Sequence, residues 1–432
     1  MKLLTFFSLW LVGAIAYAAG DKLVVHEWGT FTSLQDEAGR TLGGINTEDE
    51  PLPRFTHNID QAQVLRKNAL PPSFSKGIPE VLPRVTMRLE TPVVYFYPPT
   101  GSALPLVLDV KVTFRGGWLT EYYPNGEVNA PGAFRELTPS TLGTLAWHGL
   151  EVGVTNQGPE TSEHVWTAPR AVKAASLRTL NGESEKYLFY RGVGNVESPL
   201  RVVRDSSNDR VSIFSQPGSW AVSDSSLTVR RLWLASFRED GTAAFRKLDS
   251  VVMDKDGTKE LGATSGRFAE GDYYRNNSEK LRAAMHTALV EDGLFADEAN
   301  ALLNTWELSY FKSAGLRLFF LVPRTLTDHR LPLELSVPAE IKRVMVGRIE
   351  LVTPEQRKLL RELAAGPVPQ RAWARRVVEE GWPVLRGKMP GVYRDLGRFR
   401  NALLLDEVQR TPTPALRMFV TLNRLDNFRV EE

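Results

Sequence analysis

The chain contains no cysteine among its 432 residues. This absence excludes disulfide bonds, metal sites built on thiolates and a lipid anchor attached at a cysteine. Folding must therefore rest on a hydrophobic core, and a chain of this length can bury a large one. Hydrophobic residues make up 42% and charged residues 24%, which is the composition of an ordinary globular protein. The length alone suggests two or three domains.

Long hydrophobic runs and an excess of one charge are also missing. After the first twenty residues, no stretch approaches the roughly 20 apolar residues that span a bilayer. The formal net charge is only +2, so the composition does not favour nucleic acid or an anionic membrane as a partner. We therefore expect no nucleic-acid partner and no transmembrane span beyond the first twenty residues.

The first eighteen residues have the three parts of a cleaved secretory signal. Lys2 gives a positive start, and the run Leu3–Ile15 is uncharged and apolar. Ala16 and Ala18 then place small residues where signal peptidase requires them. The apolar run is shorter than the roughly 20 residues of a membrane span. We therefore predict a bacterial signal peptide over residues 1–18, cleavage after Ala18, and a periplasmic or extracellular location.

Residues 19–275 contain many short runs of apolar, β-branched and aromatic residues, separated by turn residues. This pattern is typical of antiparallel strands rather than of a parallel sheet with crossover helices. We predict a mainly β domain over residues 19–275, antiparallel and sandwich-like. Its expected strands are Leu23–Thr32, Val93–Tyr97, Leu106–Phe114, Tyr187–Tyr190, Leu200–Arg204, Val211–Ser215 and Leu227–Phe237.

From residue 276 the pattern changes to helical spacing. Apolar residues recur at helical intervals over Glu279–Glu291 and again over Asp297–Lys312, which predicts an αα-hairpin. Thr353 begins a capping box, with Pro at the first helical position and Gln three residues after the cap. We expect residues 276–432 to form a smaller α+β region packed on the β-rich domain. Its further elements are expected at Leu316–Val322, Leu333–Val337, Arg343–Val352, Arg371–Glu380 and Tyr393–Asp406.

Five further stretches stand out as a set: His26–Thr32, Glu90–Tyr97, Glu185–Gly194, Gly315–Arg324 and Arg343–Arg348. With these stretches the chain resembles a set of uncharacterised exported bacterial proteins whose mature part opens with the motif HEWGTFT. The resemblance covers most of the mature length, which implies export and a single structural unit. It implies no activity, cofactor or catalytic residue.

Three histidines are candidates for a metal site. Neutral imidazoles of His26, His57 and His164 could hold zinc and leave an open position for water. His26-Glu27 resembles the start of a zinc-protease helix, but Thr30 stands where the second histidine is needed. Nothing in the spacing requires a metal, and hydrogen-bonded structural roles are the alternative. Zinc stays a hypothesis for the cofactor.

Histidine and tryptophan alternate at two places, which suggests a ligand-binding face. On a strand, the side chains of His26 and Trp28 point to the same side. A strand at His164 and Trp166 would do the same. If both faces lined one cleft, indoles would meet sugar rings and imidazoles would bond their hydroxyls. The alternative is a tryptophan packed in the core beneath a hydrogen-bonded histidine.

Two carboxylates are candidates for acid–base catalysis. A glycosidase needs two facing acids, and Glu27 and Glu90 lie in or near expected strands. Burial would raise the pKa of Glu90 and suit a general acid. The alternative is a buried Glu90 paired with an arginine such as Arg88 or Arg115. The sequence gives no distances that would select a pair.

Dinucleotide, phosphate-loop and nucleophile-elbow signatures are absent. Gly192 and Gly194 lack the third glycine of a dinucleotide loop, because Glu197 occupies its place. Neither GxxxxGK[ST] nor GxSxG occurs. We therefore place first an envelope or secreted binding protein for a glycan or similar polymer. A secreted hydrolase, metal-dependent or with a carboxylate pair, is one alternative, and a structural envelope protein is another.

Overall fold

The fold comes from a computed structural model, which describes residues 22–47, 52–59, 74–75, 78–79, 82–132, 136–155, 157–205, 207, 209–216, 218, 227–366, 393 and 395–422. The signal peptide predicted over residues 1–18 and the helix predicted at Arg371–Glu380 lie outside these residues. In the part of the chain that is described, no helix is both long and apolar enough to cross a membrane.

The dominant element is a mixed sheet of 15 strands, so the prediction of a mainly β fold is confirmed. Its main path runs β11 (Ser184–Glu185), β10 (Ser176–Arg178), β9 (Leu142–Val154), β7 (Gly117–Tyr123), β12 (Leu188–Gly194), β5 (Met87–Tyr97), β1 (Leu23–Gln35), β22 (Ala339–Leu351), β20 (Gly315–Val322), β16 (Leu232–Phe237) and β17 (Ala243–Leu248). Off this path pair β2 (His57–Asn58), β6 (Leu106–Arg115), β8 (Glu127–Asn129) and β21 (Leu333–Leu335).

Three smaller sheets and a set of helices complete the described structure. The sheets are β13 (Leu200–Asp205) with β14 (Arg210–Ser215) and β19 (Glu260–Ser265), β15 (Thr228–Val229) with β18 (Val251–Val252), and β3 (Phe74–Ser75) with β4 (Ile78–Pro79). The helices are α2 (His164–Arg170), α3 (Asn277–Glu291), α4 (Ala296–Thr305), α5 (Arg324–Arg330), α6 (Pro354–Ala365), α10 (Arg400–Arg410) and α11 (Pro414–Leu422). Short turns are the 3₁₀ helix η2 (Glu270–Asp272) and the π-helix η3 (Leu308–Lys312).

The centre of the main sheet joins a strand near the N-terminus with a strand from the last quarter of the chain. β1 pairs in parallel with β22, from Leu23 opposite Ala339 to Gln35 opposite Leu351. Its other neighbour, β5, is antiparallel. Both faces of β1 are buried, as is typical of strands at the centre of a covered sheet. The boundary predicted at residue 275 stays a prediction, but it separates strands that pair within one sheet.

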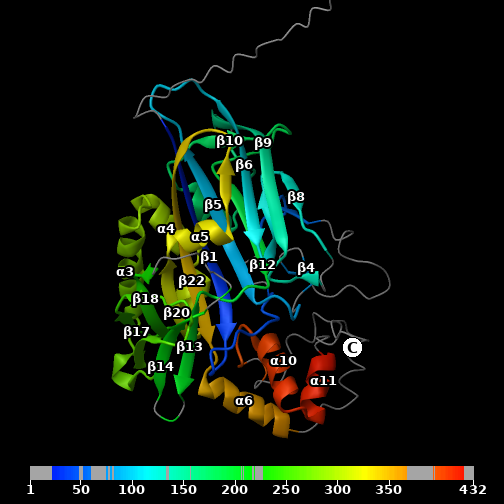
Figure 1. The fold of residues 1–432 in the computed structure, drawn as a ribbon, viewed down its shortest axis with the longest axis vertical. Helices are drawn as coiled ribbons and strands as arrows, with labels where there is room; N and C mark the ends of the chain where they lie inside the picture. The colour runs from blue at the N-terminus through cyan, green and yellow to red at the C-terminus, as the bar shows by residue number, and fades with distance from the viewer. Residues whose placement is uncertain are drawn as a thin grey trace, which may run out of the picture.

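Helices α3 and α4 form the expected αα-hairpin and cover one face of the sheet (Figure 1). Met285 of α3 and Leu302 of α4 pack in one core with Trp28 of β1. The second helix is shorter than predicted, because it ends at Thr305 and the chain continues as the π-helix η3. This face of β1 is therefore closed to solvent.

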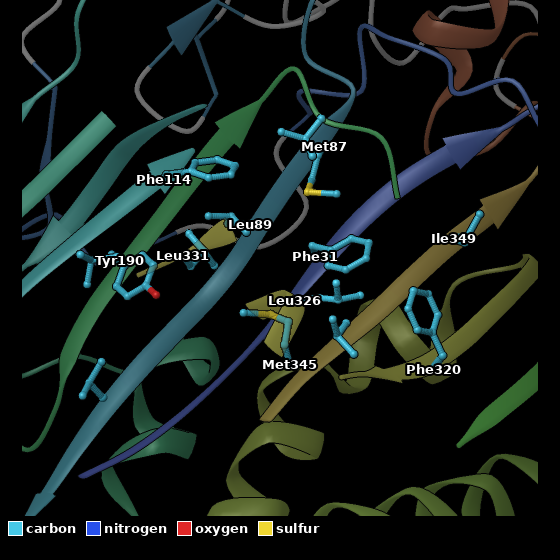
Figure 2. Packing of buried hydrophobic residues seen from close by; sticks show 14 of the residues in the cluster. Phe31, Met87, Leu89, Phe114, Tyr190, Phe320, Leu326, Leu331, Met345 and Ile349 are labelled. Atoms are coloured by element: carbon cyan, nitrogen blue, oxygen red, sulfur yellow. The ribbon is translucent and has the colours of Figure 1, made fainter. Parts of the chain in front are cut away.

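The opposite face has its own core. Phe31 of β1 meets Phe320 of β20 edge to face, with ring centroids 5.9 Å apart. Leu326 of α5 and Met345 of β22 lie in the same cluster, as Figure 2 shows. The sheet β13–β14–β19 adds Val202, among others, to this core.

Helices α6, α10 and α11 gather at one end of the sheet (Figure 1). The predicted capping box at Thr353 is present, because its hydroxyl accepts from the backbone N–H of Gln356 and the Gln356 side chain returns to the Thr353 backbone. Leu360 of α6 and Leu403 of α10 share a third core with Leu34 at the end of β1. This end of the molecule is thus tied to the central strand.

Candidate functional site

The predicted face of His26 and Trp28 exists on β1, but it is not open to a ligand. His26 is only 3% exposed and Trp28 is fully buried. His26 Nδ1 lies 2.8 Å from Oε2 of Glu298 on α4, and Tyr97 donates a hydrogen bond to the other oxygen of Glu298. The helical layer covers this face, so a ligand-binding role of His26 and Trp28 stays a prediction that their burial does not support.

The second half of the predicted face is wrong in its secondary structure. His164 and Trp166 lie on helix α2 rather than on a strand. Residues two apart on a helix point to nearly opposite sides, so His164 is exposed and Trp166 is fully buried. Val165, Trp166, Ala168 and Pro169 are the buried positions of α2, and this spacing is helical. The spacing is present in the sequence, but it extends over only seven residues that include a proline, so its helical signal is weak.

The three histidines predicted to hold a metal have separate roles. His26 pairs with Glu298, and the ring of His57 lies 2.9 Å from Oε1 of Glu183. His164 donates from Nε2 to the carbonyl oxygen of Asn304 at 2.9 Å. Among the described residues, no three histidine, aspartate or glutamate side chains form a group that could hold a metal ion. The structure therefore does not bring His26, His57 and His164 into one site.

Both predicted catalytic carboxylates are buried in contact with arginine. Glu90 Oε1 lies 2.7 Å from Nη2 of Arg88, which is the alternative that the sequence left open. Glu27 accepts at 2.6 Å from Nε of Arg343 and at 2.5 Å from the Tyr190 hydroxyl. Each glutamate is 1% exposed. A catalytic role for either stays a prediction that none of these contacts supports.

A cleft lies beside α2, where the edge of the main sheet meets the loop after β9. It encloses about 680 Å³. Helix α2 contributes one side chain to it, strands β10 and β11 contribute two, and the loop contributes most of the rest. The lining residues are Gln157, Gly158, Glu160, Thr161, Ser162, Arg170, Ser176, Glu185 and Lys186.

The buried carboxylate of Glu185 forms the floor of this cleft. It is 1% exposed and accepts from three different groups. Trp166 donates its indole N–H at 2.7 Å, and Arg170 donates from Nη2 at 2.6 Å and from Nε at 3.0 Å. The backbone N–H of Lys186 donates to the other oxygen at 2.9 Å. The predicted ligand residue Trp166 thus supports the cleft from below and does not line it.

Arg170 and Glu185 are held together by direct hydrogen bonds between their side chains. Burial alone would lower the pKa of Arg170, but the hydrogen bond and the charge of Glu185 outweigh burial and raise that pKa. Tyr187 packs beneath the pair and donates its hydroxyl to the carbonyl oxygen of Trp166. The positive charge of Arg170 and the negative charge of Glu185 therefore neutralise each other at the floor of the cleft, and their hydrogen bonds fix both side chains.

The loop over the floor is held by close backbone contact. A Cβ atom on Gly158 would lie 2.6 Å from Oε2 of Glu185 and 2.7 Å from Nη2 of Arg170. Only glycine therefore fits at this position without displacing the ion pair. Ser184 anchors the preceding residue, because its hydroxyl donates to the Gln157 carbonyl oxygen at 2.9 Å. The loop is thus docked on the floor of the cleft.

The polar groups that remain available suit binding rather than catalysis. Nη1 of Arg170 has no hydrogen-bond partner among the described residues. Among the described residues, Lys186 Nζ donates only to the carbonyl oxygens of Arg170 and Val172, at 3.1 and 3.3 Å. The remaining groups are the hydroxyls, the Gln157 amide and the exposed Glu160. Together they can donate to and accept from a polar ligand.

Sequence reasoning missed Arg170, Glu185 and Lys186. The stretch that contains Glu185 stood out only by resemblance, and no spacing connects it with Arg170. A charged pair directly before the apolar strand at residues 187–190 was the available signal. A charged pair at that position does not identify the element that will pack against it, or which face of that element will do so.

Comparisons with known proteins identify no family. No family model matches the chain, and no curated protein matches it. Among solved structures, it is 8% identical to the Fcho1 Mu homology domain of Danio rerio with bound Eps15 peptide, with a TM-score of 0.28, covering 77% of this chain and 96% of that one. For the yeast delta-COP-I mu-homology domain complexed with a Dsl1 WxWxV peptide, the identity is 8%, the TM-score 0.29 and the coverage 78% and 100%. Similarity this low assigns neither a fold family nor a ligand to this chain.

Proposed function

We propose that this protein is an exported binding protein that holds a hydroxyl-rich ligand, a glycan, in the cleft beside α2. One observation carries the proposal. The cleft of about 680 Å³ is lined by hydroxyl, amide and charged groups over a fixed, buried ion pair. Sugar hydroxyls both donate and accept, so they match such a mixed lining. None of the described residues that line it is aromatic, so the proposed recognition rests on hydrogen bonds and not on stacking.

Binding fits the cleft better than glycoside hydrolysis. A glycosidase needs two carboxyl groups that face each other across the sugar. Here Glu185 already accepts from Trp166, Arg170 and the Lys186 backbone, which leaves Glu160 as the other lining carboxylate. A single exposed glutamate does not supply the acid–base pair. The hydrolase alternative therefore gains no support from this cleft.

Export is part of the proposal and rests on the first eighteen residues. Their charged start, apolar run and small residues at positions 16 and 18 form a secretory signal. The resemblance to the HEWGTFT set implies the same. Intact mass of the protein from the envelope fraction of an expressing bacterium should correspond to a chain that begins at Ala19. A mass that still includes residues 1–18 would contradict export by this route.

The binding proposal is tested by filling the cleft. Ser162 is exposed, lines the cleft and makes no hydrogen bond with a described residue, so Ser162→Trp should fold normally and obstruct the ligand. The matched control is Ser140→Trp. Ser140 is an exposed turn residue just before the first residue of β9, whereas the cleft loop follows the last residue of β9. On a panel of neutral and acidic glycans, wild type and control should bind and Ser162→Trp should not. Equal glycan binding by the Ser162→Trp and Ser140→Trp variants would contradict the proposal.

A further inference from the structure

We propose that the glycan is acidic, and that Lys186 and Arg170 bind its carboxylate. This inference rests on the proposed function, because it names the class of ligand that the same cleft takes. Carboxylate-bearing sugars such as uronic acids have the required chemistry: one anionic group among many hydroxyls. The charged side chains that line the cleft differ in whether a neighbouring charge already neutralises them.

Two of the four lining charges cancel each other. Arg170 and Glu185 form the floor pair, with Nη2 of the guanidinium 2.6 Å from the carboxylate. Lys186 and Glu160 remain. Glu160 is exposed on the loop, where water and salt screen its charge. Lys186 is half-buried beside the floor, where its charge acts at closer range and is screened less. The inner part of the cleft therefore favours an anion.

The ammonium group of Lys186 is held in place without a counter-ion. Its Nζ donates to the carbonyl oxygens of Arg170 and Val172, at the carboxyl-terminal end of α2. The Arg170 carbonyl belongs to the last turn of α2, where carbonyls lack intrahelical partners, and Val172 lies two residues beyond the helix. An ammonium group has three N–H donors, so one is left for a ligand. Lys186 forms no ion pair with any residue that the structure describes.

Arg170 supplies the second donor. Its Nε and Nη2 are committed to Glu185, which fixes the plane of the guanidinium. Nη1 keeps its two N–H groups and belongs to a residue that lines the same cleft. Charge-assisted hydrogen bonds from guanidinium and ammonium to a carboxylate are stronger than those between neutral groups. Arg170 and Lys186 thus each bring a charged donor to the lining of the same cleft.

The remaining lining favours a saccharide over an acidic peptide. Thr161, Ser162 and Ser176 offer hydroxyls, and Gln157 offers an amide. These groups match the alternating donors and acceptors around a sugar ring. In the part of the chain that the structure describes, the lining has no aromatic and no large aliphatic residue to receive a peptide's apolar side chains. An acidic peptide would use the two cations and leave the hydroxyls unmatched.

The test compares two probes with the same sugar backbone, one with free carboxylates and one in which methyl esters remove the negative charge. Tetragalacturonic acid and its fully methyl-esterified form are titrated calorimetrically into the mature protein, with tetraglutamate as the peptide arm. Wild type should bind the acid at least about tenfold more tightly than the ester, and added salt should reduce this difference. Lys186→Gln should weaken binding of the acid about tenfold and leave the ester unchanged. Lys186→Arg should retain most of the preference.

The control variant is Lys173→Gln, which removes an exposed lysine charge that lies outside the cleft lining. It should bind both probes as wild type does. Melting temperatures of all variants establish that they are folded. Equal affinity of wild type for acid and ester, or an unchanged Lys186→Gln, would overturn the inference while the glycan function stands. Binding of tetraglutamate but not of the saccharide would overturn the ligand class. If wild type binds no glycan of the panel and neither saccharide probe, the proposed function itself is contradicted.

Discussion

At the residue scale, Trp166 is a buried core residue beneath the cleft. Its ring packs against Phe55, Tyr123, Tyr187 and Phe189, and its N–H bonds to the buried carboxylate of Glu185. A buried carboxylate is costly unless several donors satisfy it. The tryptophan therefore stabilises the fold and orients the floor of the cleft together.

Trp166→Ala should lower the free energy of unfolding by about 3–5 kcal/mol, because it leaves a large cavity and removes a donor from Glu185. Urea unfolding of the purified variant measures this loss. Leu180→Ala is the matched control, since Leu180 is 80% exposed and its truncation should change stability by less than about 0.5 kcal/mol. A Trp166→Ala protein as stable as wild type would contradict the packing described for α2.

Some single-residue roles could be predicted from the sequence, and others could not. The pairing of Glu90 with Arg88 follows from their spacing, because residues two apart on a strand share a face. The partner of His26 could not be predicted, since Glu298 lies far along the chain and reaches it only when α4 covers β1. The same holds for Arg170 and Glu185. Contacts between distant segments depend on packing that no local pattern encodes.

At the element scale, α6 and α10 are attached to the central strand by a network of ion pairs. Arg357 of α6 contacts Glu37, which follows β1, and also Asp406 of α10. Burial alone would raise the pKa of Glu37, but its hydrogen bond and its attraction to Arg357 lower that pKa below the ordinary value. Arg410 adds to the same effect.

The lowered pKa of Glu37 has a definite consequence for stability against pH. The folded state holds the proton less readily than the unfolded chain, so the stabilisation is complete above the ordinary glutamate pKa of about 4.3 and is lost as pH falls through the lowered value. Glu37→Gln should therefore cost about 1–3 kcal/mol at pH 7 and progressively less as the pH falls below the ordinary glutamate pKa. Thermal melts across this pH range test this. Glu334→Gln, an exposed glutamate on β21, is the control; a pH-independent loss for Glu37→Gln would contradict the ion-pair account.

Elements with a strong local signal were predicted well. β6, β13, β14 and β20 lie within a residue or so of their predicted bounds, and the capping box at Thr353 is present. The segment Leu227–Phe237 was predicted as one strand but forms two, β15 and β16, in different sheets. The short helix α2 was missed, because seven residues that include a proline give a weak helical signal.

At the scale of the whole molecule, the fold depends on a pairing between β1, near the N-terminus, and β22, in the last quarter of the chain. β22 lies beside β1 in the middle of the sheet, and β20 joins β22 to β16. Parallel pairing between strands more than 300 residues apart leaves no mark in either strand's own pattern. The change to helical spacing near residue 276 is real, but it marks a layer added to the sheet rather than the end of the sheet.

A fragment of residues 19–275 should consequently fail to fold alone. Without β22 and β20, β1 and β16 lose their hydrogen-bond partners and expose unpaired backbone and apolar side chains. We expect an insoluble or non-cooperative product by circular dichroism, whereas the mature full-length chain should give a cooperative transition. A soluble fragment with a cooperative melt would contradict this account and support an independent β-rich domain.

The central claim is that the cleft beside α2, with Glu185 at its floor, is where this protein binds its ligand. The most direct measurement is a crystal structure of the mature protein soaked with the glycan that binds most tightly. We predict the sugar between the loop 157–162 and Lys186, with its carboxylate near Nη1 of Arg170. A glycan bound elsewhere on the molecule, or a panel in which no glycan binds, would contradict the claim.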